Sequence, residues 1–150
     1  MSRTKSQIEH MLNLALALSL NHYKFYLDAA EAVSSPKTKA LLLVLAESEE
    51  SLAGEIEDMI ATGIVDEIEK AAEFDEEDSP DETPFALERM DTDPRIYICN
   101  KSLEQEIKGY TFFLSIAARA KSELISRLFQ YFAHTKREQI AKIRRVCETF

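Results

Sequence analysis

Apolar residues recur at every third or fourth position along four stretches of this chain, which is the spacing of an amphipathic helix. The stretches cover about residues 5–33, 36–61, 98–120 and 122–148. A chain of 150 residues with only three Gly and four Pro contains few helix breakers. The pattern therefore predicts four long helices and an all-α fold.

Capping residues lie where these helices are expected to begin and end. Ser35 precedes Pro36, and serine is a good N-cap while proline suits the first position of a helix. Gly63 fits the C-terminal stop of the second helix. Ser122 is placed to cap the fourth. Since the turns after the first and third helices are short, we expect two antiparallel helical hairpins.

The two predicted hairpins are repeats of one another. When the sequence is shifted by 87 residues against itself, Tyr23–Leu27 (YKFYL) aligns without gaps with Tyr110–Leu114 (YTFFL). The same shift pairs further identical residues: Asn13 with Asn100, Leu16 with Leu103, Ala30 with Ala117, Leu41 with Leu128, Ala46 with Ala133 and Ile56 with Ile143. An ungapped match of this kind indicates that each hairpin is one structural unit.

We expect a single domain over residues 1–150. Its two hairpins, at 5–62 and 98–149, are joined by a crossover at 63–97. The crossover is strongly acidic, because residues 66–93 contain thirteen acidic and two basic side chains. The rest of the chain is therefore slightly basic, although the net charge of the whole is −9.

Within the crossover we expect a short helix at 65–74 and irregular chain after it. The irregular part contains the acidic run Asp75–Asp78 and the residues Pro80, Pro84 and Pro94. Such a run is usually a solvated surface segment. It could instead contact a basic protein partner, bind divalent ions weakly, or fold back on the bundle's own basic residues, which are Arg137, Lys142, Arg144 and Arg145.

A few polar residues interrupt the apolar faces of the four predicted helices. Ser19 and Glu49 lie equally far from the first turn, and Glu106 and Lys136 lie equally far from the second. In antiparallel hairpins, equal distance from the turn means equal height along the bundle. We therefore expect these four side chains to meet in one buried layer.

Two further polar residues, His22 and Gln139, are expected one turn away from this layer along their helices. Buried charge is costly unless it is paired. Two carboxylates that face each other in a core must share a proton or gain a cation. In this chain either a metal ion or the ammonium of Lys136 would supply that cation.

The aromatic segment Tyr23–Tyr26 with the following Ala29-Ala30, and the segment Leu45–Glu49 (LAESE), resemble the rubrerythrin branch of the ferritin-like superfamily. The resemblance covers all four predicted helices. It implies an all-α, ferritin-like four-helix bundle of two helical hairpins joined by a long acidic crossover. It also implies a homodimer, since rubrerythrin-like bundles commonly pair.

The same resemblance implies a pair of irons in the bundle core, held by one Glu from each of two helices and a Glu-x-x-His from each of the others. The implied positions hold Ser19, Glu106, Glu49, Leu52, Lys136 and Gln139 in this chain. Only Glu49 and Glu106 retain a ligand of the family's type, and both histidines are replaced. Because a pair of irons needs several anionic oxygens and preferably imidazole, these replacements predict that the family's oxidase or peroxidase chemistry is lost.

Two hypotheses about function follow. In the first, Lys136 bridges Glu49 and Glu106, with Ser19 and Gln139 completing the hydrogen bonds. The protein then has no cofactor and no catalytic residue, and it is a non-catalytic structural or interaction protein. In the second, His22, Glu49 and Glu106 bind a single iron, manganese or other divalent ion, and the protein has a redox or storage-related role.

Composition and charge exclude several partners. A net charge of −9 argues against nucleic-acid binding, which needs a basic face. The apolar run 11–20 imitates a signal peptide, but His10 and Asn13 interrupt it, and it is too short to span a membrane. We therefore expect a cytoplasmic protein without a membrane anchor. Cys99 and Cys147, the two cysteines, are expected to be reduced thiols.

Overall fold

The computed structural model describes residues 3–62 and 79–150, and within these ranges all regular structure is helical. The elements are α1 (Arg3–Ala32), α2 (Pro36–Thr62), the 3₁₀ helix η1 (Leu87–Arg89), α4 (Pro94–Arg119) and α5 (Glu123–Cys147). The predicted all-α four-helix bundle is confirmed. No helix in the described part of the chain combines the length and the hydrophobicity that crossing a bilayer requires.

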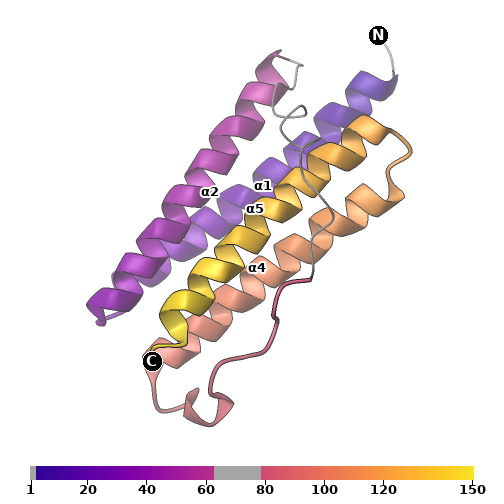
Figure 1. The fold of residues 1–150 in the computed structure, drawn as a ribbon. Coiled ribbons are helices and arrows are strands. Elements are labelled where there is room, and N and C mark those ends of the chain that lie inside the picture. Colours follow the sequence, from indigo (N-terminus) through magenta and orange to yellow (C-terminus); the bar gives the residue numbers. More distant parts are fainter. Residues whose placement is uncertain (1–2, 63–78) are drawn as a thin grey trace.

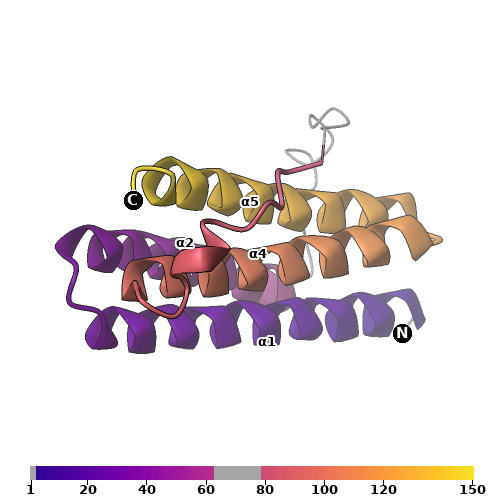
Figure 2. The same cartoon turned by 90° about the horizontal axis from the view of Figure 1, so that it is seen from below.

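The four long helices form two hairpins that pack side by side (Figures 1 and 2). Helix α1 packs along α2, and α4 packs along α5, with smaller contacts between α1 and α4 and between α2 and α5. The Lys37 ammonium at the start of α2 donates to the Thr149 hydroxyl after the end of α5, at 2.5 Å. The end of α2 and the start of α4 lie at opposite ends of the bundle (Figure 1), as expected for two hairpins joined by a crossover.

The third long helix begins four residues earlier than the sequence predicted, at Pro94 instead of residue 98. Asp93 caps it, because the Asp93 carboxylate accepts the backbone N–H of Arg95 at 3.0 Å. Proline suits the first helical position, so Pro94 starts this helix and does not break it. The predicted cap of the fourth helix is confirmed, since the Ser122 hydroxyl accepts the Ile125 N–H.

Three sequence predictions lie outside the described residues. These are the helix stop near Gly63, the short helix at 65–74 and the acidic run Asp75–Asp78. The crossover is described only from residue 79 to residue 93, the residue that caps α4.

The apolar core is divided into two clusters along the bundle. The first lies toward the start of α4 and includes Tyr26, Leu45 and Ile143, and the second includes Leu52 and Phe113. Six residues spaced three or four positions apart along α2 are buried and form its inner face: Leu42, Leu45, Glu49, Leu52, Ile56 and Met59. The predicted polar layer separates the two apolar clusters.

Cys99 and Cys147 form a disulfide bond that joins the first turns of α4 to the last turn of α5. The prediction of two reduced thiols is therefore wrong. The two residues differ by about one helical turn in their distance from the connecting turn, which argued against a bond. Their Cα atoms are nevertheless 6.1 Å apart, which is within the range that a disulfide spans.

The end of the crossover folds back on the second hairpin. The Arg144 guanidinium forms an ion pair with Asp81 at 3.3 Å and donates to the Asp81 and Thr83 carbonyl oxygens. Of the basic residues expected to attract the crossover, Arg144 is thus confirmed. Residues 79–93 are called the docked segment below.

The inner face of α4 yields a direct test of the packing. The Phe113 side chain is fully buried against the rings of Phe129 and Phe132, whereas its neighbour Phe112 is 38% exposed. We expect Phe113→Ala to lower the free energy of unfolding by about 3–5 kcal/mol, because it leaves a cavity in the second cluster. Chemical denaturation measures this, with Phe112→Ala as the matched control expected to cost much less. Equal losses in the two variants would contradict the packing described here.

Candidate functional site

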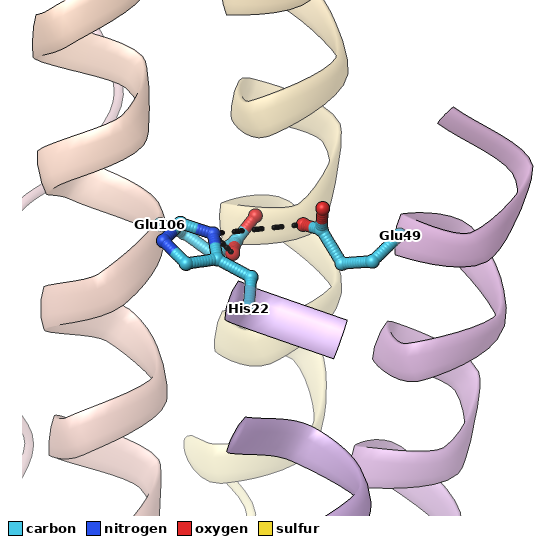
Figure 3. Close-up of side chains that lie close together, drawn as sticks. All are labelled: His22, Glu49 and Glu106. Carbon is cyan, nitrogen blue, oxygen red and sulfur yellow. Dashed lines mark ion pairs between the residues drawn. The ribbon is translucent and has the colours of Figure 1, made fainter. Parts of the chain in front are cut away.

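A histidine and two glutamates converge between the hairpins, in the layer between the apolar clusters (Figure 3). His22 comes from α1, Glu49 from α2 and Glu106 from α4. One nitrogen or oxygen atom from each lies within 4.8 Å of the others, and all three side chains are buried. Nδ1 of His22 lies 3.4 Å from Oε2 of Glu106 and 3.8 Å from Oε1 of Glu49. This set has the chemistry of a small cation site.

The side chain of Lys136, from α5, brings an ammonium group among these three residues. Its Nζ lies 2.8 Å from Nδ1 of His22 and 3.3 Å from Oε2 of Glu106, and it is in direct contact with Oε1 of Glu49. An ammonium has three N–H donors, and here it has three acceptors. Lys136 is fully buried, so its charge depends on these neighbours for compensation.

Two hydroxyl groups complete the hydrogen bonding of the carboxylates. Ser19 on α1 donates to Oε2 of Glu49 at 2.8 Å, and Tyr26 on the same helix donates to Oε2 of Glu106 at 2.6 Å. Oε1 of Glu106 has no hydrogen-bond partner among the described residues. We call Ser19, His22, Tyr26, Glu49, Glu106 and Lys136 the polar cluster.

Gly109 makes room for the polar cluster on α4. A Cβ atom at this position would lie 3.1 Å from Cε of Lys136 and 3.3 Å from Cε1 of His22. Glycine in a helix interior is destabilising by about 1 kcal/mol relative to alanine, so its presence on the inner face needs a reason. The close approach of the Lys136 and His22 side chains is that reason.

The geometry around His22 is compatible with either of its two proton states. When Nδ1 carries a lone pair it accepts from Lys136, and the ionised groups then sum to one negative charge. When His22 is protonated the sum is zero, and Nδ1 donates to Glu106. Burial lowers the pKa of His22, but hydrogen bonds to Glu106 and Glu49 outweigh it, so that the pKa lies above 6.5.

Glu106 and Tyr26 respond to the same charges. Burial raises the pKa of Glu106, but the nearby Lys136 ammonium, together with hydrogen bonds from His22 and Tyr26, brings it below 4.5. Burial and the Glu106 carboxylate raise the pKa of Tyr26 well above 10.0. Tyr26 therefore keeps its proton and remains a donor to Glu106.

The structure brings together all four residues that the sequence placed in one layer. The predicted meeting of Ser19, Glu49, Glu106 and Lys136 is confirmed by the contacts above. His22 lies one turn from Ser19 along α1, as expected, but its side chain reaches the layer, and its Nδ1 lies close to Lys136, Glu49 and Glu106.

The two remaining predicted positions do not take part in the cluster. The amide of Gln139 donates to the Leu45 carbonyl oxygen at 3.4 Å, so the prediction that it completes the hydrogen bonds around the carboxylates was wrong. Leu52 is buried in the second apolar cluster and offers no ligand atom.

Sequence reasoning missed Tyr26 and Gly109. From the sequence, Tyr26 was considered only as part of an aromatic segment and was given no polar contact, yet a buried phenol needs a hydrogen-bond partner, and Tyr26 lies one turn from His22 on the inner face of α1. Gly109 could have been found as a glycine in the middle of a predicted inner helix face, where a close approach is the usual explanation.

The residues present do not fit a pair of irons. Of the six implied ligand positions only Glu49 and Glu106 carry a suitable group, and the Lys136 ammonium lies between them. A cationic side chain at a ligand position raises the electrostatic cost of adding two further cations. A single ion bound by His22, Glu49 and Glu106 fits the donor chemistry, provided that the Lys136 ammonium moves away or loses its proton.

Comparison of the chain with protein-family models, with curated proteins and with solved structures gave no match.

Removal of the central ammonium tests the charge pairing. We expect Lys136→Met to lower the free energy of unfolding by about 3–5 kcal/mol, because it leaves two buried carboxylates without their cation. In the triple variant Lys136→Met, Glu49→Gln, Glu106→Gln, most of this loss should be recovered. Urea denaturation of the three proteins measures the difference, and a Lys136→Met variant as stable as the wild type would refute the pairing.

The pKa shifts in the cluster predict how stability varies with pH. The pKa of His22 is raised by folding, so its contribution is present below pH 6.5 and is lost as pH rises through the folded-state pKa. The pKa of Glu106 is lowered, so its contribution is present above pH 4.5 and is lost as pH falls through the folded-state pKa. Both contributions are present between pH 4.5 and 6.5.

Thermal denaturation should be measured from well below pH 4.5 to well above pH 6.5. We expect the melting temperature to fall on the acid side and on the alkaline side of this interval. The His22→Gln variant should lose the fall on the alkaline side and keep the one on the acid side. An unchanged alkaline fall in this variant would assign the effect to another group.

The chain offers a matched pair of glycines to test the space around Lys136. A Cβ added at Gly54 in α2 would meet nothing within 4 Å, so we expect Gly54→Ala to stabilise the protein by up to about 1 kcal/mol. We expect Gly109→Ala to destabilise it by about 1 kcal/mol, because crowding of Lys136 and His22 outweighs the gain in helix propensity. Stabilisation of both variants to the same degree would show that the two side chains adjust freely.

Proposed function

We propose that this protein is a degenerate ferritin-like bundle of the rubrerythrin type, in which the ammonium of Lys136 takes the place of the metal ions. In this proposal the polar cluster stabilises the bundle and catalyses no reaction. The protein then acts as a structural or interaction protein, with no resident cofactor.

The observation that carries the proposal is the position of the Lys136 nitrogen. It touches the same three groups, His22, Glu49 and Glu106, that form a candidate cation site. Electrostatically, one positive charge among two carboxylates does part of what metal ions do in such a site. The long return between two helical hairpins and the repeat of those hairpins support the ferritin-like connection.

A second candidate function is binding of one divalent ion by His22, Glu49 and Glu106, with a redox or storage-related role. The compact arrangement of the three ligand atoms favours it, and so does the buried Oε1 of Glu106, for which the described residues supply no partner. A divalent ion would balance the two carboxylates only if the Lys136 ammonium left the cluster or lost its proton.

Partners and location are also proposals. A homodimer follows from the ferritin-like assignment alone, and a basic protein partner would match the acidic crossover. A cytoplasmic location is part of the proposal, and the Cys99–Cys147 bond argues against it, because reducing compartments keep most protein thiols reduced.

Metal binding by a lysine variant separates the two candidate functions. We expect the wild-type protein, purified without chelators, to contain far less than one equivalent of iron, manganese or zinc. The Lys136→Met variant should bind one Co²⁺ or Zn²⁺, because it leaves His22 and two carboxylates without an internal cation. Calorimetry, the visible spectrum of Co²⁺ and the rise in melting temperature on adding Zn²⁺ measure this binding.

The triple variant Lys136→Met, Glu49→Gln, Glu106→Gln is the control, and it should bind no metal. Stoichiometric metal in the wild-type protein, abolished by Glu49→Gln, would overturn the first function and support the second. A Lys136→Met variant that binds no metal would show that the ammonium does not stand in for one.

A further inference from the structure

The Cys99–Cys147 disulfide joins α4 and α5, the two helices whose side chains bind the docked segment near Phe85. Asn100 follows Cys99 directly in α4, and Arg144 precedes Cys147 by one turn in α5. Both side chains bind residues 81–85 of the crossover. The disulfide therefore fixes the distance between two anchors that act on the same short stretch of chain.

The first anchor is Asn100, whose side chain binds both the N–H and the carbonyl oxygen of Phe85. The Asn100 carbonyl oxygen accepts the Phe85 N–H at 2.8 Å, and the Asn100 amide donates to the Phe85 carbonyl oxygen at 2.9 Å. Both hydrogen bonds are buried, and an amide side chain that pairs in this way copies the bonding of a neighbouring strand. Phe85 loses both bonds if α4 moves away from it.

The second anchor is Arg144 on α5, which binds residues 81–85. The Arg144 guanidinium lies 4.8 Å from the centre of the Phe85 ring, in addition to its contacts with Asp81 and Thr83. The Phe85 ring belongs to the apolar cluster that also contains Cys99 and Cys147. Docking thus needs α4 and α5 at one fixed separation, and each anchor raises the effective concentration of the other.

We propose that the disulfide is a redox-sensitive clasp, whose reduction releases the docked segment from the second hairpin while the bundle stays folded. With the bond broken, the start of α4 and the end of α5 are free to separate, and Asn100 and Arg144 no longer meet Phe85 together. The signal is the thiol–disulfide state of the surroundings, and the element that responds is the end of the acidic crossover.

The chemistry is thiol–disulfide exchange with a dithiol reductant. The dithiol supplies two electrons and two protons, and it becomes a cyclic disulfide. The Cys99–Cys147 bond breaks, and each sulfur gains one electron and one proton to become a thiol. Since both cysteines are buried, with 0% and 2% exposure, a dithiol reaches them only when the structure opens locally.

Hydrogen exchange on the full chain tests the proposal. The Phe85 amide reports docking, because its N–H is bound to Asn100, and the Leu45 amide in α2 reports the integrity of the bundle. We expect dithiothreitol to accelerate exchange at Phe85 by about tenfold, and to change exchange at Leu45 far less. Asn100→Ala should accelerate Phe85 exchange to a similar degree with the disulfide intact.

Thermodynamic linkage supplies a reciprocal test, because a bond that favours docking must in turn be favoured by docking. In dithiothreitol redox buffers, Arg144→Met should shift the Cys99–Cys147 equilibrium toward thiols by about the factor seen at Phe85. Arg145→Met, which removes the neighbouring exposed arginine, is the matched control and should leave the equilibrium unchanged.

Three results would overturn the clasp. The first is a Phe85 amide whose exchange does not change on reduction. The second is equal acceleration at Phe85 and Leu45, which would make the disulfide a general stabiliser of the whole bundle. The third is an equal response of the Arg144→Met and Arg145→Met variants in the redox buffers.

Discussion

The attraction between one buried ammonium and two buried carboxylates dominates this structure. Lys136, Glu49 and Glu106 are all out of contact with water, and in such surroundings each charge is tolerated only because the others are close. His22, Ser19 and Tyr26 supply the remaining hydrogen bonds. Because each of the four long helices contributes to this contact, the cluster fixes the register of the helices as well as the balance of charge. Apolar packing alone would tolerate small shifts along the bundle axis, whereas an ion pair does not.

The repeat explains how such an arrangement arises on a common scaffold. Positions related by the shift of 87 residues keep the same burial but differ in chemistry: Ser19 matches Glu106, His22 matches Gly109, Tyr26 matches Phe113, and Glu49 matches Lys136. In the pair His22 and Gly109, the histidine is large, and the glycine leaves space for it. In the last, the partners carry opposite charges and touch one another. The two hairpins thus share a backbone and divide the polar functions between them.

Much of this could be predicted from the sequence, because distance from a turn fixes height in an antiparallel hairpin. That rule placed Ser19, Glu49, Glu106 and Lys136 correctly. It failed where side-chain direction matters. Helical side chains lean toward the N-terminus of their helix, so His22 reaches the layer that its backbone position seems to miss. Gln139 lies level with Leu45 and finds a carbonyl oxygen there. The disulfide was missed because counting residues from a turn is accurate only to about one helical turn, which is the offset between Cys99 and Cys147.

The contact between Glu49 and Lys136 has a consequence for how a duplicated hairpin can evolve. In a symmetric assembly of two identical hairpins, a residue that meets its own equivalent must meet a copy of itself. At this position such an assembly would oppose glutamate to glutamate or lysine to lysine, and both would repel. When the halves are encoded separately, as they are within one continuous chain, one copy can become acidic and the other basic. Covalent fusion therefore permits an attractive pair of opposite charges at a position where two identical hairpins could place only like charges or neutral groups.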